Sequence, residues 1–60
     1  NDPGFAIAIH SRGELNIARS NWSAARADLE RACAVYAKLG HANLGQAKMQ
    51  LADVVSKLER

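Results

Sequence analysis

The hydrophobic positions of this chain recur at helical spacing in three segments that are separated by two short breaks. Over residues 22–39 and 42–58, apolar side chains gather on one face of an ideal helix, and charged or polar ones lie opposite. We therefore predict an all-α fold with three helices, at residues 3–19, 22–39 and 42–58. Because both breaks are short, consecutive helices are expected to pack antiparallel.

The two later segments give explicit core faces. The second helix is expected to bury Trp22, Ala25, Leu29, Ala32, Cys33, Tyr36 and Leu39. The third is expected to bury Leu44, Ala47, Leu51, Val54, Val55 and Leu58.

Capping residues mark most of the predicted helix ends. The pair Asp2-Pro3 is typical of a helix start, and Asn21 is placed to cap the second helix. Gly40 predicts a left-handed C-cap. The third helix has two candidate caps, His41 and Asn43.

The first segment has no single apolar face. Its apolar residues spread around the whole helix and comprise Phe5, Ile7, Ala8, Ile9, Leu15, Ile17 and Ala18. A helix of this kind is buried on more than one side. Two further helices cover only part of it, so we expect another chain or another helix to cover the rest.

Charge and length exclude several classes of protein. The net charge is +2, and bases alternate with acids, as in RADLER at residues 26–31, so a nucleic-acid stripe is not indicated. No apolar run approaches the roughly 18–20 residues of a membrane span. The single cysteine, Cys33, forms no internal disulfide, which is consistent with a cytoplasmic protein.

Candidate catalytic and metal-binding chemistry is sparse. His10, His41 and Cys33 are the soft ligands, and no pair of them has metal-ligand spacing. We expect both histidines at the surface and the cysteine buried. The acids Asp28, Glu30, Asp53 and Glu59 lie beside basic residues and are expected to be solvated surface charges. We therefore expect no enzymatic activity, no metal and no cofactor.

A set of spaced residues resembles the tetratricopeptide repeat, a helix–turn–helix unit that stacks into a solenoid. The matching positions are Gly13, the turn Ser20-Asn21, Trp22, Ala25, Leu29 and Ala32. The segment LGHANLGQAKMQLADVVSKL at 39–58 is similar to the first helix of a following repeat. The resemblance covers residues 6–58, about one and a half repeats of the longer-helix bacterial type, so the chain is expected to form a single domain that belongs to a longer array.

In that family a small residue lets the second helix approach the first closely. The resemblance therefore places Gly13 at a helix contact, with Ala25 and Ala32 opposite. Arg12 and Asn16 depart from the pattern, because they stand where the first helix usually carries apolar core residues. The closing proline of the family is absent as well.

The resemblance implies a non-catalytic protein–protein interaction scaffold that binds a partner peptide or helix in a groove lined by the first helices of the repeats. Carried over by position, the partner-facing residues are Ile7, His10, Glu14, Ile17, Gln46, Met49, Asp53, Ser56 and Lys57. Two alternatives remain open. One is a homo-oligomerisation module that uses the all-round apolar first helix. The other is a small DNA-associated helical domain, because residues 46–56 faintly resemble part of a helix-turn-helix.

Overall fold

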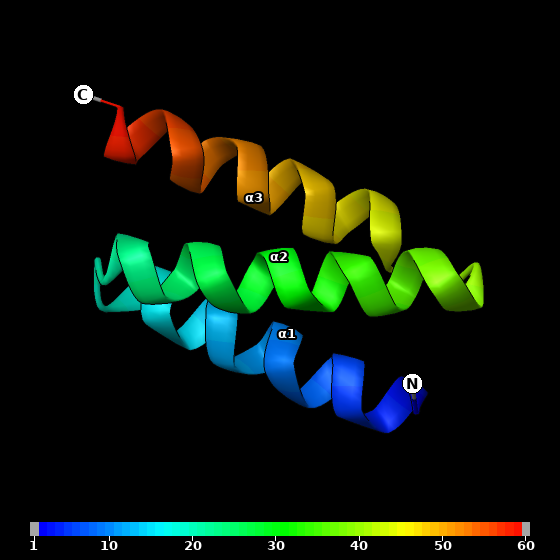
Figure 1. The fold of residues 1–60 in the computed structure, drawn as a ribbon. Coiled ribbons are helices and arrows are strands. Elements are labelled where there is room, and N and C mark those ends of the chain that lie inside the picture. The colour runs from blue at the N-terminus through cyan, green and yellow to red at the C-terminus, as the bar shows by residue number, and fades with distance from the viewer. Residues whose placement is uncertain (1, 60) are drawn as a thin grey trace.

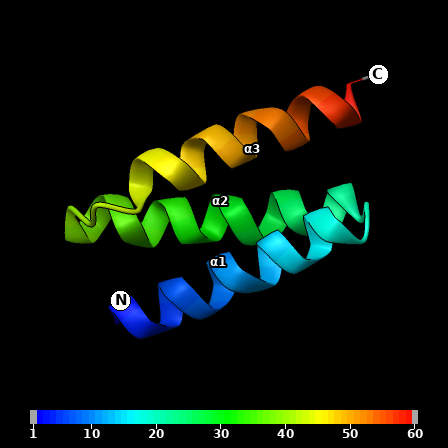
Figure 2. The ribbon, with the colours of Figure 1, turned by 180° about the vertical axis from the view of Figure 1, so that it is seen from behind.

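The computed structural model describes residues 2–59, which form three α-helices and no strand. These are α1 (Pro3–Ala18), α2 (Trp22–Leu39) and α3 (Leu44–Leu58). Figure 1 shows α2 between the other two and antiparallel to both, so α1 and α3 run in roughly the same direction. The view from behind shows the same order (Figure 2). The all-α prediction and the antiparallel packing are confirmed.

The predicted cap positions of α1 and α2 are confirmed at Asp2, Asn21 and Gly40. Asp2 accepts a hydrogen bond from the backbone N–H of Gly4 through Oδ1, at 2.8 Å. Gly40 ends α2 in the left-handed conformation, with φ 62° and ψ 34°. Asn21 occupies the N-cap position of α2, but its side chain makes no capping hydrogen bond, so that part of the prediction is wrong. Its backbone N–H instead donates to the carbonyl oxygen of Asn16, at 2.8 Å, and closes the turn.

Helix α3 begins at Leu44, two residues later than predicted. Residues 41–43 form a turn, in which the backbone N–H of Asn43 donates to Nδ1 of His41 at 3.0 Å. The N–H of Leu44 donates to the carbonyl oxygen of His41 at 3.1 Å. The histidine ring therefore satisfies a backbone donor at the helix start, while Asn43 holds the N-cap position without a side-chain capping hydrogen bond and donates through Nδ2 to the hydroxyl of Tyr36 at 3.5 Å.

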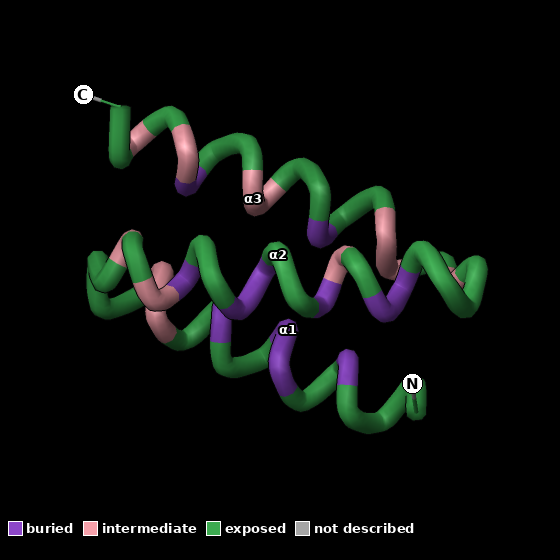
Figure 3. Tube along the Cα trace, in the orientation of Figure 1, coloured by how far each residue is buried: buried purple, intermediate pink, exposed green. Residues whose placement is uncertain are grey.

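The core consists of two clusters, and each takes residues from all three helices (Figure 3). One contains Ala6, Ile9, Ala32, Val35, Tyr36 and Ala47. The other contains Ala25, Leu29 and Val54, with Ile17, Trp22 and Leu51 packed against it. The predicted faces of α2 and α3 supply most of these residues. Leu39 and Leu58 remain exposed, because each lies in the last turn of its helix.

Gly13 is the point of close approach between α1 and α2. A Cβ atom on this glycine would lie 3.2 Å from Cγ of Leu29 and 3.3 Å from Cβ of Asp28. The predicted contact is confirmed, but its partners are Leu29 and Asp28 rather than Ala25 and Ala32. The helices cross where the glycine faces the middle of α2.

Helix α1 keeps apolar side chains in solvent, as its all-round pattern predicts. Phe5, Ile7 and Leu15 are exposed, the last with half of its surface accessible. Within the described residues, every helix is too short or too polar to cross a bilayer.

Candidate functional site

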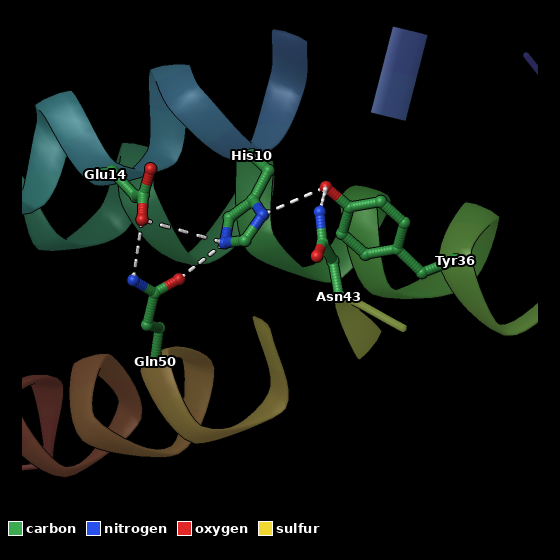
Figure 4. A network of polar contacts seen from close by, with 5 residues as sticks. All are labelled: His10, Glu14, Tyr36, Asn43 and Gln50. Carbon is green, nitrogen blue, oxygen red and sulfur yellow. Dashed lines mark hydrogen bonds and ion pairs between the residues drawn. The ribbon is translucent and has the colours of Figure 1, made fainter. Parts of the chain in front are cut away.

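A buried histidine joins the three helices. His10 is only 6% exposed, so the expectation of a surface histidine is wrong at this position. It points from α1 into the space between α2 and α3, as Figure 4 shows. Its side chain is therefore not free at the surface, although it lies on the side of α1 predicted to face a partner.

Both ring nitrogens of His10 have hydrogen-bond partners. Nδ1 lies 3.0 Å from the hydroxyl of Tyr36 on α2, and Nε2 lies 2.6 Å from Oε1 of Gln50 on α3. Because an amide oxygen only accepts, Nε2 carries a proton and donates to Gln50, while Nδ1 is paired with the tyrosine hydroxyl.

The network continues to the surface through Gln50. Nε2 of Gln50 donates to Oε2 of Glu14 at 2.9 Å, and the carboxylate is also 4.0 Å from Nε2 of His10 (Figure 4). On the inner side, the ring of His41 stacks on Tyr36 at a centroid distance of 4.9 Å. The result is a continuous polar chain that ties α1 to α3 and orients the exposed Glu14.

A second polar cluster lies on the other flank of α1. Asp28 is 7% exposed, so the expectation of a solvated surface charge is wrong here. Its carboxylate accepts from Nε and Nη2 of Arg12, with a shortest distance of 2.8 Å, and from Nδ2 of Asn16 at 3.0 Å. The hydrogen bonds and charge of Arg12, with help from Asn16, lower the pKa of Asp28 despite the opposing effect of burial.

This cluster explains the two departures from the tetratricopeptide pattern. Arg12 and Asn16 are polar because the residue that faces them on α2 is an aspartate rather than an apolar side chain. A buried carboxylate needs donors on its neighbours, and these two residues supply them.

The predicted partner-facing residues divide into an exposed group and a packed group. The exposed group contains Ile7 and Glu14 of α1 and Gln46, Met49, Asp53 and Ser56 of α3. We call this surface the α1–α3 face. Ile17 is half-buried in the second core cluster, and Nζ of Lys57 lies 5.4 Å from the ring centroid of Trp22. Those two side chains therefore have contacts within the chain.

Sequence reasoning did not identify Gln50, which is the link between the buried histidine and the face. A signal was present in the helical spacing, because Gln50 is four residues after Gln46 and three before Asp53, both predicted to face a partner. The role of Tyr36 as a hydrogen-bond partner of His10 was hidden, because its position on the apolar face of α2 indicated packing alone.

The remaining candidate chemistry does not converge. Cys33 is half-buried, and desolvation raises the pKa of its thiol, against a smaller lowering by Lys48. Between residues 2 and 59 no three His, Cys, Asp or Glu side chains are placed to hold a metal ion. A shallow depression of about 500 Å³ lies away from the His10 network and is lined by Ser23, Arg26, Ala27, Glu30 and Leu58.

Comparisons of the chain with protein-family models, with curated proteins and with solved structures gave no match.

Proposed function

We propose that this chain is a non-catalytic protein-interaction scaffold, built as a tetratricopeptide-like helical hairpin followed by one further helix, and that the α1–α3 face binds a partner peptide or helix. The carrying observation is the exposure of apolar side chains on this face. Met49 is 75% exposed and Ile7 is 43% exposed. Exposed apolar side chains beside polar ones are typical of an interaction surface.

The arrangement of the helices supports this proposal. Helices α1 and α2 approach each other closely at a glycine, as in the repeat family, and α3 packs on α2 and runs in the same direction as α1. In a helical repeat array, the first helices of successive repeats have this parallel arrangement and line one surface.

The His10 network supports the proposal in a second way. It fixes the relative position of α1 and α3 through hydrogen bonds of 2.6 and 2.9 Å that pass through Gln50. A surface that is already ordered loses less conformational entropy when a partner binds.

Selection from a displayed library of random peptides tests this function. Peptides enriched on the wild-type chain are expected to lose affinity for Met49→Gln by about tenfold, because a mostly exposed thioether that becomes buried on binding contributes about 1.4 kcal/mol. Lys38→Gln, on an exposed position of α2, is the control and should bind normally.

The proposal fails if the selected peptides bind Met49→Gln and the wild type equally well. It also fails if selection yields no peptide that distinguishes the wild-type chain from a chain unfolded in urea.

A homo-oligomerisation module is the second candidate function. The observation in its favour is the exposure of Phe5 and Leu15 on α1, because neither belongs to the α1–α3 face or to a core cluster. A second copy of the chain that packs on these residues would give α1 its missing cover.

A further inference from the structure

We propose that the partner of the α1–α3 face is a cationic segment, with an apolar side chain that packs on Met49 and Ile7 and with Lys or Arg residues that pair with Glu14 and Asp53. This inference rests on the proposed function and specifies the chemistry of its partner.

The first step is the position of the two carboxylates. Gln50 of α3 touches both His10 and Glu14 of α1, so this side of α3 faces α1. Asp53 follows Gln50 by three residues and therefore lies on the same side, about one turn further along. Glu14 and Asp53 thus belong to the same end of the face.

Each of the two helices carries an exposed apolar residue before its carboxylate. Ile7 precedes Glu14 by seven residues and shares its side of α1, while Met49 comes one turn before Asp53 on α3. Ala6 and Ala47 belong to the same core cluster, so these early turns of α1 and α3 contribute to the same part of the core. On each helix the apolar residue therefore precedes the carboxylate.

The second step is the charge. The whole chain has a net charge of +2, yet the exposed ionisable groups of the α1–α3 face are the two carboxylates. Lys57, the nearest cation in this row of α3, lies over the ring of Trp22. Arg12 is held by Asp28 on the opposite flank of α1. Lys57 keeps its charge, but its Nζ is turned to Trp22, so the two exposed carboxylates of the face are open to a basic partner.

The third step is that hydrogen bonds hold the carboxylate of Glu14 in one orientation. Oε2 of Glu14 accepts from Gln50, whose oxygen is in turn held by buried His10. Glu14 is 45% exposed along its side chain, so the carboxylate is oriented and still open to solvent. A fixed carboxylate loses little side-chain entropy when it pairs with a cation.

The helical rise sets the spacing that the partner needs. Seven residues of α1 correspond to about 10 Å between Ile7 and Glu14. An extended partner covers that distance in about three residues, and a helical one in about seven. The partner therefore carries its apolar anchor and its cation at one of these separations.

Three synthetic peptides of equal length test the inference with the whole chain. Each has leucine anchors, and the three peptides differ in carrying lysine, glutamine or glutamate at the remaining contact positions. Binding is measured by titration calorimetry at low and at physiological salt. The lysine peptide should bind most tightly and lose affinity with salt. Glu14→Gln and Asp53→Asn should each weaken it by about two- to fivefold, as expected for solvent-exposed ion pairs.

Glu30→Gln is the matched control, because Glu30 is an exposed glutamate of α2 away from the face. It changes net charge by the same amount and should leave binding unchanged. Circular dichroism should show the same helicity for all variants, since the side chains of Asp53 and Glu30 lie at the surface and Glu14→Gln preserves the shape of its side chain.

The outcomes separate this inference from the proposed function. The glutamine or glutamate peptide could bind as tightly as the lysine peptide and lose its affinity in Met49→Gln. That result would overturn the cationic partner and leave the scaffold function standing. The inference is also overturned if Glu30→Gln weakens binding of the lysine peptide as much as Glu14→Gln and Asp53→Asn do. The attraction between chain and peptide would then be non-specific. Peptide binding that is insensitive to Met49→Gln contradicts the scaffold itself.

Discussion

At the scale of single residues, two polar side chains are buried between the helices. Asp28 and His10 each have a complete set of partners, and no buried side-chain nitrogen or oxygen in residues 2–59 is left without one. Burial of a polar group is tolerated when its hydrogen bonds are replaced within the protein. These two clusters therefore fix how α1 sits on its neighbours, in addition to the apolar contacts.

The Asp28 cluster makes stability depend on pH in acid. Arg12 lowers the pKa of the folded-state carboxylate, so its contribution is fully present above the usual aspartate range and is lost as pH falls through the folded-state value. Asp28→Asn should destabilise the chain by about 1–2 kcal/mol at neutral pH. Urea unfolding at decreasing pH should show this difference beginning to shrink below about pH 4, where the carboxylate of the unfolded chain takes up its proton. The difference should continue to shrink as pH falls through the lower pKa of the folded state.

Asp53→Asn is the control for this measurement, because Asp53 is exposed. Its difference from the wild type should stay small at every pH. A deficit of Asp28→Asn that persists unchanged into acid would show that the charge of Asp28 makes no contribution.

At the scale of the elements, each pair of helices is joined in a different way. Contact between α1 and α2 is close at Gly13, and α2 meets α3 along its predicted apolar face. Between α1 and α3, the hydrogen bonds through Gln50 add a polar link to the contacts of the core clusters. The polar link matters most for the α1–α3 face, because it aligns the two helices that form it.

Substitution of Gly13 tests the close approach of α1 and α2. Gly13→Leu should destabilise the chain by about 1–3 kcal/mol or unfold it, because fully buried Leu29 leaves no room. Gly13→Ala should change stability by less than about 1 kcal/mol, since the gain in helix propensity is opposed by contacts of 3.2–3.3 Å. Thermal and urea unfolding followed by circular dichroism measure both effects.

Gly45→Ala provides the comparison, because a Cβ at Gly45 in α3 meets nothing within 4 Å. This variant should be stabilised by about 0.5–1 kcal/mol through propensity alone. An equal gain in Gly13→Ala would show that α1 and α2 are not in tight contact at this glycine.

At the scale of the whole molecule, the chain has little apolar surface to bury. A domain of this size buries only about 60% of the surface of its unfolded chain, and here some of the largest apolar side chains stay in solvent. Self-association is the direct way for α1 to cover Phe5 and Leu15. It does not compete with the α1–α3 face, because those residues lie elsewhere on the helix.

Oligomerisation should therefore stabilise the chain. We expect a melting temperature that rises with protein concentration and a mass above that of the monomer in analytical ultracentrifugation. Leu15→Glu should return the mass to the monomer value, because a charge replaces an exposed leucine at the contact. Ala34→Glu, on an exposed position of α2, should leave the association intact.

A monomer mass with a sharp melting transition at every concentration would contradict this expectation. The same result would remove the oligomerisation module as a function and would leave the peptide-binding scaffold untouched.

The sequence by itself determined the helices and their order, and its resemblance to the repeat family indicated the close contact at Gly13. Periodicity and capping are local properties, and they place α1, α2 and α3 within two residues of their observed ends. Only the tertiary structure showed that Asp28 and His10 are buried, because their partners lie up to 40 residues away. The burial of a polar residue depends on what faces it, and helical spacing describes only the helix on which it stands.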